Sequence, residues 1–151
     1  MTGNASRQQR GPWRRPRAPL ARLEPGLPAH WYHDCAHYRQ ELAAIWHAMW
    51  VCAGREEEIA APRDTRVVSI GTQSLLILRG DDGALRAFHN TCRHRGSILC
   101  AEERGSLKSE RIVCPYHSWT YDMDGRLLAT PRQMETAGFD RAKFPLHAVR
   151  V

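Results

Sequence analysis

The sequence lacks several features that would each place it in a particular class of protein. It has no run of roughly 18 consecutive apolar residues, so no segment is predicted to cross a membrane as a helix. Its five cysteines do not form the even, regular framework of a small disulfide-stabilised secreted protein. It also contains no internal repeat. We therefore expect no membrane partner and a reducing, cytoplasmic location.

The positive charge is confined to one end of the chain. The net charge is +6, but residues 1–30 hold six arginines and one acidic residue, so residues 31–151 carry only +1. Basic residues in a tail are usually solvated and do not form a folded nucleic-acid-binding face, so we expect no nucleic-acid partner. An Arg-rich, acid-poor tail is also compatible with an organelle transit peptide, and this alternative stays open.

A chain of 151 residues is long enough for one domain with a substantial core. Five prolines lie in residues 1–28, which predicts a disordered basic Pro/Arg-rich tail over residues 1–27. Asp34 is a suitable N-cap, and apolar residues recur at helical spacing as far as Trp50. The pattern predicts an amphipathic helix over residues 35–48, within an N-terminal helical entry segment over residues 28–62. We expect its apolar face to pack into the core.

Short apolar runs follow from residue 63 onward. Turn signals at Asp81–Gly83 and Met123–Gly125 separate runs that are typical of β-strands. The predicted strand segments are residues 67–70, 75–78, 85–88, 112–113, 119–121 and 127–128, and residues 144–151 lead toward another strand. We predict a mainly β fold: an antiparallel β sandwich over residues 63–151, preceded by the helix and the tail.

Two short sequences each place one cysteine and one histidine close together. Cys92 and His94 lie in His-Asn-Thr-Cys-Arg-His-Arg-Gly, and Cys114 and His117 lie in Cys-Pro-Tyr-His-Ser-Trp. Two thiolates and two imidazoles make a complete set of four metal ligands. The other three cysteines have no paired ligand spacing, and we expect them to be buried, unreactive thiols: Cys35, Cys52 and Cys100.

Two kinds of metal centre accept this set of ligands. A Cys2His2 zinc site is the first, although such sites tend to pair Cys with Cys and His with His in each half. A Rieske [2Fe–2S] cluster is the second, because two cysteines bind one iron and two histidines bind the other. The mixed loops favour the cluster, because each loop supplies one ligand to each iron, but the spacing alone leaves zinc open.

The residues around the four ligands resemble a known family. Cys92-Arg-His-Arg-Gly96 and Cys114-Pro-Tyr-His-Ser-Trp-Thr-Tyr121, followed by Asp124-Gly125, are similar to the Rieske domain of ring-hydroxylating oxygenase α subunits. The family often has Gly at the position of Ser118. The resemblance implies that Cys92 and Cys114 bind one iron of a Rieske-type [2Fe–2S] cluster and that His94 and His117 bind the other.

The same comparison implies a low reduction potential. Rieske proteins of respiratory complexes have a disulfide between the two loops, and the matching positions here are Ser97 and Tyr116. They also have a serine hydroxyl that donates to a bridging sulfide, where this chain has Trp119. Fewer hydrogen bonds stabilise the reduced cluster less, so we predict a potential toward the lower end of the roughly −150 to +300 mV Rieske range.

The resemblance extends over residues 27–151 and favours an oxygenase subunit. A stand-alone Rieske ferredoxin-like carrier, the alternative, would begin almost directly with strands, whereas this chain has a helical entry segment first. The family members are mono- or dioxygenases that hydroxylate aromatic compounds or demethylate small quaternary amines. Their partners are an NAD(P)H-dependent reductase or ferredoxin, which donates electrons, and neighbouring α subunits in a trimer.

In that family a second domain follows and holds a mononuclear Fe(II) on two histidines and a carboxylate. The sequence stops at Val151 without such a domain, so the expectation is a truncated oxygenase α subunit. It should bind the cluster and deliver single electrons to a mononuclear non-haem iron that is not in this chain. We expect no catalytic residues here, and no oxygenation by these 151 residues alone.

Overall fold

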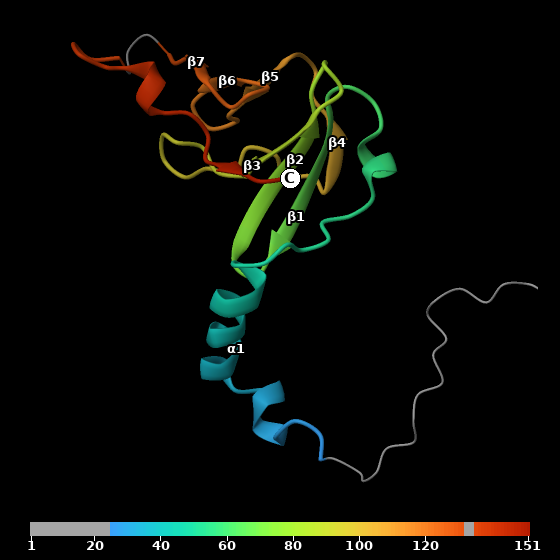
Figure 1. Ribbon diagram of the computed structural model, residues 1–151. Helices are drawn as coiled ribbons and strands as arrows, with labels where there is room; N and C mark the ends of the chain where they lie inside the picture. Colours follow the sequence, from blue (N-terminus) through green and yellow to red (C-terminus); the bar gives the residue numbers. More distant parts are fainter. Residues whose placement is uncertain (1–24, 132–134) are drawn as a thin grey trace, which may run out of the picture.

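The computed structural model describes residues 25–131 and 135–151 (Figure 1). Its helical elements are η1 (Ala29–Tyr32), α1 (Cys35–Glu41), η2 (Leu42–Trp46), η3 (Glu56–Ile59) and η5 (Arg141–Lys143). Its strands are β1 (Asp64–Ile70), β2 (Gln73–Arg79), β3 (Leu85–His89), β4 (Arg104–Ser106), β5 (Arg111–Val113), β6 (Thr120–Asp122), β7 (Leu127–Ala129) and β8 (Ala148–Val149). The predicted disordered tail falls almost entirely on residues 1–24, which lie outside the described residues.

The strands form two antiparallel sheets, which confirms the mainly β prediction. One sheet has the order β4-β1-β2-β3-β8 and the other the order β5-β6-β7. The predicted strand segments all lie within or beside these strands, whereas β4 has no apolar pattern and was not predicted. Its backbone pairs with the edge of β1, so its strand conformation comes from tertiary pairing more than from propensity.

The main core lies between the two sheets. The inward-facing Leu76 and Leu78 of β2 and Phe88 of β3 pack against Ile112 of β5 and Tyr121 of β6, all at most 3% exposed. Neighbouring side chains of β2 point to the opposite face, because side chains alternate along a strand. That second face forms a smaller cluster of Ile59, Ile77 and Ala87. The uninterrupted apolar run of β2 thus has both faces covered.

The helix begins as predicted but does not bury its apolar face. The Asp34 carboxylate accepts a hydrogen bond from the Ala36 N–H at 2.7 Å, as an N-cap does. The predicted apolar face consists of Leu42 and four further side chains. Leu42 is buried, but the other four are 44% to 75% exposed: Ile45, Trp46, Met49 and Trp50. The prediction that this face packs into the core was therefore wrong for four of its five side chains.

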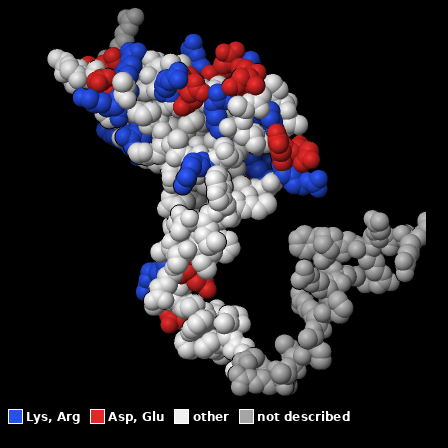
Figure 2. All heavy atoms as spheres, viewed as in Figure 1, with Lys and Arg blue, Asp and Glu red and all other residues white. Residues whose placement is uncertain are grey.

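The reason is the placement of the helix. It projects from one end of the β sandwich, and no described element covers its apolar side (Figures 1 and 2). Figure 2 shows the projecting segment as largely uncharged, in contrast to the mixed charges over the sheets. Hydrophobic periodicity predicts that one face of a helix is apolar, but it does not specify what covers that face. Within the described residues, no helix is long and apolar enough to cross a bilayer.

The segment after β3 forms a tight loop closed by its own backbone. The Cys92 N–H donates to the Ser97 carbonyl at 2.8 Å, and the Gly96 N–H donates back to the Cys92 carbonyl at 3.0 Å. Gly96 has a φ of 72°, a left-handed conformation that glycine adopts without steric cost. The loop therefore holds its shape through bonds between residues at most five positions apart.

The segment after β5 forms a second loop with the same pattern. The Cys114 N–H donates to the Trp119 carbonyl at 2.8 Å, and the Ser118 N–H donates to the Cys114 carbonyl at 3.0 Å. Ser118 has a φ of 55° and occupies the position that Gly96 has in the first loop. The two loops thus share one backbone design, although their Cys/His spacings differ.

The first loop is also held by the buried side chain of Asn90, which is 1% exposed. Its side-chain N–H groups donate to the Cys100 carbonyl at 2.7 Å and to the Ser74 hydroxyl at 3.2 Å. Its carbonyl oxygen accepts from the N–H groups of Leu99 and Cys100 at 3.2 and 3.0 Å. One amide therefore ties both ends of the loop to β2.

The equivalent positions of the two loops predict opposite effects of two substitutions. Gly96→Ala should lower the free energy of unfolding by about 1 kcal/mol, because an alanine in the left-handed region is strained. A Cβ at Gly96 would meet no atom within 4 Å, so no clash adds to this cost. Ser118→Gly should raise stability by up to about 1 kcal/mol for the converse reason. Urea denaturation followed by circular dichroism measures both; a loss of stability in both variants would contradict the shared design.

The hydrogen bonds of Asn90 predict that Asn90→Ala is strongly destabilising. It would leave buried N–H and carbonyl groups of the loop without partners, at a cost of about 3 kcal/mol. Ser74→Ala is the matched control, because it removes only one of these bonds and should cost about 1 kcal/mol. The two losses are compared by the same denaturation measurement. Equal losses would show that Asn90 acts only through Ser74.

Candidate metal centre

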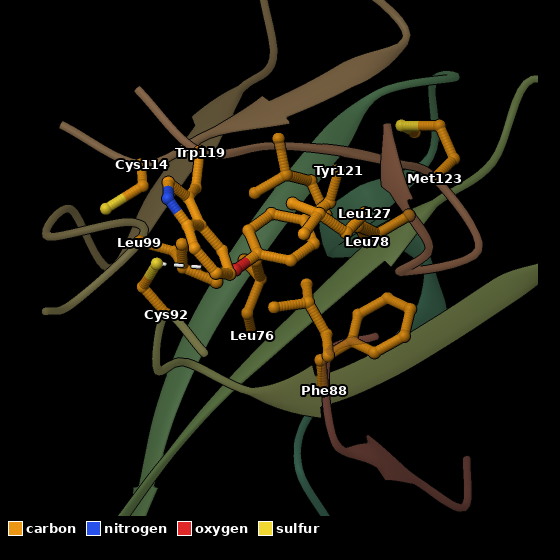
Figure 3. Close-up of a cluster of buried hydrophobic side chains, with 12 residues drawn as sticks. Leu76, Leu78, Phe88, Cys92, Leu99, Cys114, Trp119, Tyr121, Met123 and Leu127 are labelled. Carbon is orange, nitrogen blue, oxygen red and sulfur yellow. Dashed lines mark hydrogen bonds between the residues drawn. The ribbon is translucent and has the colours of Figure 1, made fainter. Parts of the chain in front are cut away.

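The four residues predicted as ligands lie together, at the two loops. The imidazole centroids of His94 and His117 are 4.9 Å apart, with the ring planes at 69°. Cys92 and Cys114 are each 2% exposed and belong to the same hydrophobic core cluster. Figure 3 shows both sulfur atoms at the same edge of that core, beside Trp119. The two thiols are thus on the inner side of the site, whereas both imidazoles are only half-buried.

Tyr121 places a hydrogen-bond donor on one of the two sulfurs. Its hydroxyl lies 3.3 Å from Cys92 Sγ (Figure 3), and the side chain is completely buried. The hydroxyl oxygen accepts the Arg93 N–H at 3.1 Å, and a metal-bound Cys92 thiolate has no proton, so the hydroxyl is the donor to the sulfur when a metal is bound. The signal in the sequence was the Trp-x-Tyr end of the second motif, but the residue's partner was not predicted from it.

The surroundings of Cys92 and His94 favour the neutral thiol and the neutral imidazole. Burial raises the pKa of the Cys92 thiol, opposed by the Tyr121 hydroxyl, while the adjacent Cys114 raises this pKa further. Burial, and then the neighbouring His117 and Arg95, lower the pKa of His94. A neutral imidazole is the form that binds metals, and a metal displaces the proton of a protonated thiol. This set of donors therefore releases protons when a metal binds.

Three buried nitrogen atoms at the site have no hydrogen-bond partner among the described residues: Arg93 Nε, His117 Nδ1 and Trp119 Nε1. Buried polar atoms are rarely left unsatisfied, and each such case needs an explanation. For His117 Nδ1 a bond to a metal is one, because an imidazole nitrogen is a good ligand. The residues present therefore fit a group bound by two thiolates inside and two imidazoles outside, as in a Rieske cluster.

The fit to one metal ion is different. Within residues 25–131 and 135–151, no group of three or more His, Cys, Asp and Glu side chains is placed to hold a single ion. The ligands of a two-iron cluster need not converge in that way, because they are divided between two metal atoms.

The remaining cysteines depart from the expectation of burial. Cys35 and Cys52 are exposed and Cys100 is half-buried, where burial raises its pKa. Cys35 begins the projecting helix, and Cys52 lies in the extended segment after it, so neither reaches the sandwich core. None of the five cysteines forms a disulfide. Ser97 and Tyr116, which stand in place of the two disulfide cysteines of respiratory Rieske proteins, lie on separate loops, and Tyr116 is 60% exposed.

Comparisons with known proteins show the family of the chain. Residues 49–140 match the family described as "Rieske [2Fe-2S] domain". The chain is 42% identical over 125 residues to the glycine betaine monooxygenase oxygenase subunit of Pseudomonas aeruginosa. It is 37% identical over 124 residues to the chloroplastic choline monooxygenase of Beta vulgaris. These matches cover 83% and 82% of this chain but only 28% and 27% of the two relatives.

Solved structures give the same result for the fold. A quaternary ammonium Rieske monooxygenase in complex with γ-butyrobetaine superposes with a TM-score of 0.75 at 31% identity, over 82% of this chain and 35% of that one. A naphthalene 1,2-dioxygenase superposes with a TM-score of 0.70 at 30% identity, over 78% of this chain and 26% of that one. The family match spans well over half of the sequence, and the likeness includes both loops. The chain belongs to the Rieske [2Fe–2S] domain family.

Proposed function

We propose that this chain binds a Rieske [2Fe–2S] cluster, with Cys92 and Cys114 on one iron and His94 and His117 on the other, and uses it to transfer single electrons. The observation that carries the assignment is that two loops of the same backbone design bring these four side chains together, with His117 Nδ1 buried and without a partner. We place the cluster-binding unit at residues 63–151, after the entry segment of residues 28–62.

The chain's own residues set how such a cluster is held. When bound, a cluster of this kind accepts and gives up one electron at a time. Cys92 and Cys114 anchor it in the apolar core, which excludes water from the sulfur ligands. His94 and His117 lie toward the surface, where a redox partner can approach. Tyr121 donates to a ligand sulfur, which stabilises the added negative charge of the reduced state.

The biological role we propose is that of the electron-transfer part of an oxygenase. Electrons would come from an NAD(P)H-dependent reductase or a ferredoxin and pass on to a mononuclear non-haem iron. The relatives named above are oxygenase subunits or oxygenases, which favours this role over a stand-alone carrier. Inter-subunit electron transfer is described for a similar quaternary ammonium Rieske monooxygenase, which supports neighbouring α subunits as partners. We place the protein in the cytoplasm.

We further propose that the oxygenase it serves acts on quaternary ammonium compounds. The relatives with 42% and 37% identity are a glycine betaine and a choline monooxygenase, whereas the naphthalene dioxygenase is 30% identical. The chain spans less than a third of the length of the glycine betaine and choline monooxygenases, so the substrate of the whole enzyme is a proposal.

The ligand assignment predicts two irons and two acid-labile sulfides per chain, and a Rieske EPR signal after reduction. His117→Cys should abolish that signal, because the second iron loses one of its nitrogen ligands. Cys92→Ser should reduce the iron content. Cys100 lies outside the proposed ligand set, so Cys100→Ser should leave the iron content and the EPR signal unchanged. Stoichiometric zinc without sulfide would refute the cluster, and an unaltered EPR signal in His117→Cys would refute the ligand assignment.

The proposed partner class predicts the behaviour of two chimaeras. In the first, residues 27–151 replace the matching part of the glycine betaine monooxygenase subunit; in the second, they replace that of naphthalene 1,2-dioxygenase. The first should retain substrate oxidation with its own reductase, and the second should lose most of it, because this chain is 42% identical to the first enzyme and 30% identical to the second. His117→Ala in the first chimaera is the control and should be inactive. Retention of activity only in the naphthalene chimaera would contradict the proposed class.

A further inference from the structure

Trp119 carries a buried hydrogen-bond donor that the proposed ligand set does not use. Its side chain is 3% exposed, and its Nε1 atom is fully buried without a hydrogen-bond partner in the described part of the chain. An indole N–H can only donate, so it cannot be satisfied by another donor. Leaving such a group unsatisfied loses the hydrogen bond that the indole N–H makes with water in the unfolded chain, so a buried N–H of this kind calls for an acceptor.

The surroundings of Trp119 show where an acceptor can lie. The indole stacks on the imidazole of His94, with centroids 4.9 Å apart and planes at 8°. The ring of His117, whose Nδ1 is also buried and unpartnered, is likewise 4.9 Å from the His94 ring. These two unpartnered nitrogens therefore belong to neighbours of the same candidate ligand.

Two phenylalanine rings also pack against the indole, and neither carries an atom that accepts a conventional hydrogen bond. Phe139 and Phe144 meet it at 77° and 88°, with centroid distances of 5.9 and 5.7 Å. In Figure 3 the nitrogen edge of the indole faces the side where Cys114 is drawn, and the opposite edge faces Tyr121. The nitrogen thus points away from the Tyr121 hydroxyl and toward the side of the site where the Cys114 sulfur is drawn.

We propose that the indole N–H of Trp119 donates a hydrogen bond to a sulfur atom of the bound [2Fe–2S] cluster and thereby raises its reduction potential. This inference rests on the proposed function, because the acceptor is the cluster. Trp119 is then a residue that tunes the cofactor, in addition to packing against His94. No sequence pattern indicated this role, since tryptophan stands where other Rieske proteins have a serine hydroxyl; the indole supplies a donor of its own from that position.

The sign of the effect follows from charge. Reduction adds one negative charge to the cluster, so a donor to its sulfur stabilises the reduced state more than the oxidised state. Tyr121 donates to Cys92 Sγ by the same logic. Removal of the Trp119 donor should therefore shift the equilibrium toward the oxidised cluster. A change of about tenfold in the equilibrium constant corresponds to about 59 mV for a one-electron couple.

The first experiment detects the hydrogen bond without altering the protein. The full chain is produced with tryptophan labelled with ¹⁵N in the indole ring, reduced, and studied by pulsed EPR. We expect a ¹⁵N hyperfine coupling and an exchangeable proton coupling at the cluster. Both should vanish in labelled Trp119→Phe, and both should persist in labelled Trp50→Phe, whose indole is 75% exposed on the projecting segment. Absence of the ¹⁵N coupling in the unaltered chain, as expected if the N–H points at a phenylalanine ring, would overturn the inference.

The second experiment measures the potential. Trp119 is replaced by benzothienylalanine, which keeps the shape of the indole and has sulfur in place of the N–H group. We expect a potential lower by the equivalent of about tenfold in the equilibrium constant, with iron and sulfide content unchanged. The control Trp50→Phe should leave the reduction potential unchanged. An unchanged potential in a fully loaded variant overturns the role of Trp119 alone, whereas an unaltered chain without iron and sulfide overturns the proposed function.

Discussion

Cys92 and Cys114 serve two purposes that constrain each other. Both are candidate metal ligands, and both are core residues, packed with Leu76, Trp119 and Tyr121 between the two sheets. A buried thiol is apolar enough to fit a core, but a thiolate is not unless a metal or a donor compensates its charge. The core can therefore accept metal-bound sulfur only where it also provides donors, and Tyr121 is one of them.

The sequence predicted the parts of this arrangement that depend on local pattern. The strand runs, the N-cap at Asp34 and the proximity of His94 to His117 could be read from spacing and residue type. The strand β4 and the hydrogen bonds of Asn90 could not, because they arise between segments far apart in the chain. The exposed face of the helix was mispredicted for a related reason: periodicity describes one element, whereas burial depends on its neighbours.

The site is graded from inside to outside. The cysteine side chains are 2% exposed, whereas the imidazoles of His94 and His117 are half-buried and Tyr116 lies over His117 with a centroid distance of 3.7 Å. The low-dielectric side thus holds the sulfur ligands, and the side nearer to water holds the neutral nitrogen ligands. Added charge is better solvated on the outer side, which is also where a partner can make contact.

The backbone of each loop closes on itself, and this has a consequence for how the domain can vary. The backbone hydrogen bonds that shape the first turn connect Cys92 with residues 96 and 97, and those of the second connect Cys114 with residues 118 and 119. None of these four bonds involves the segment that joins the two turns. Residues 108–110, which are exposed and lie between β4 and β5, can therefore change in length and composition while the two turns keep their form. Insertions and deletions within the domain should accumulate in that stretch and be absent from the turns.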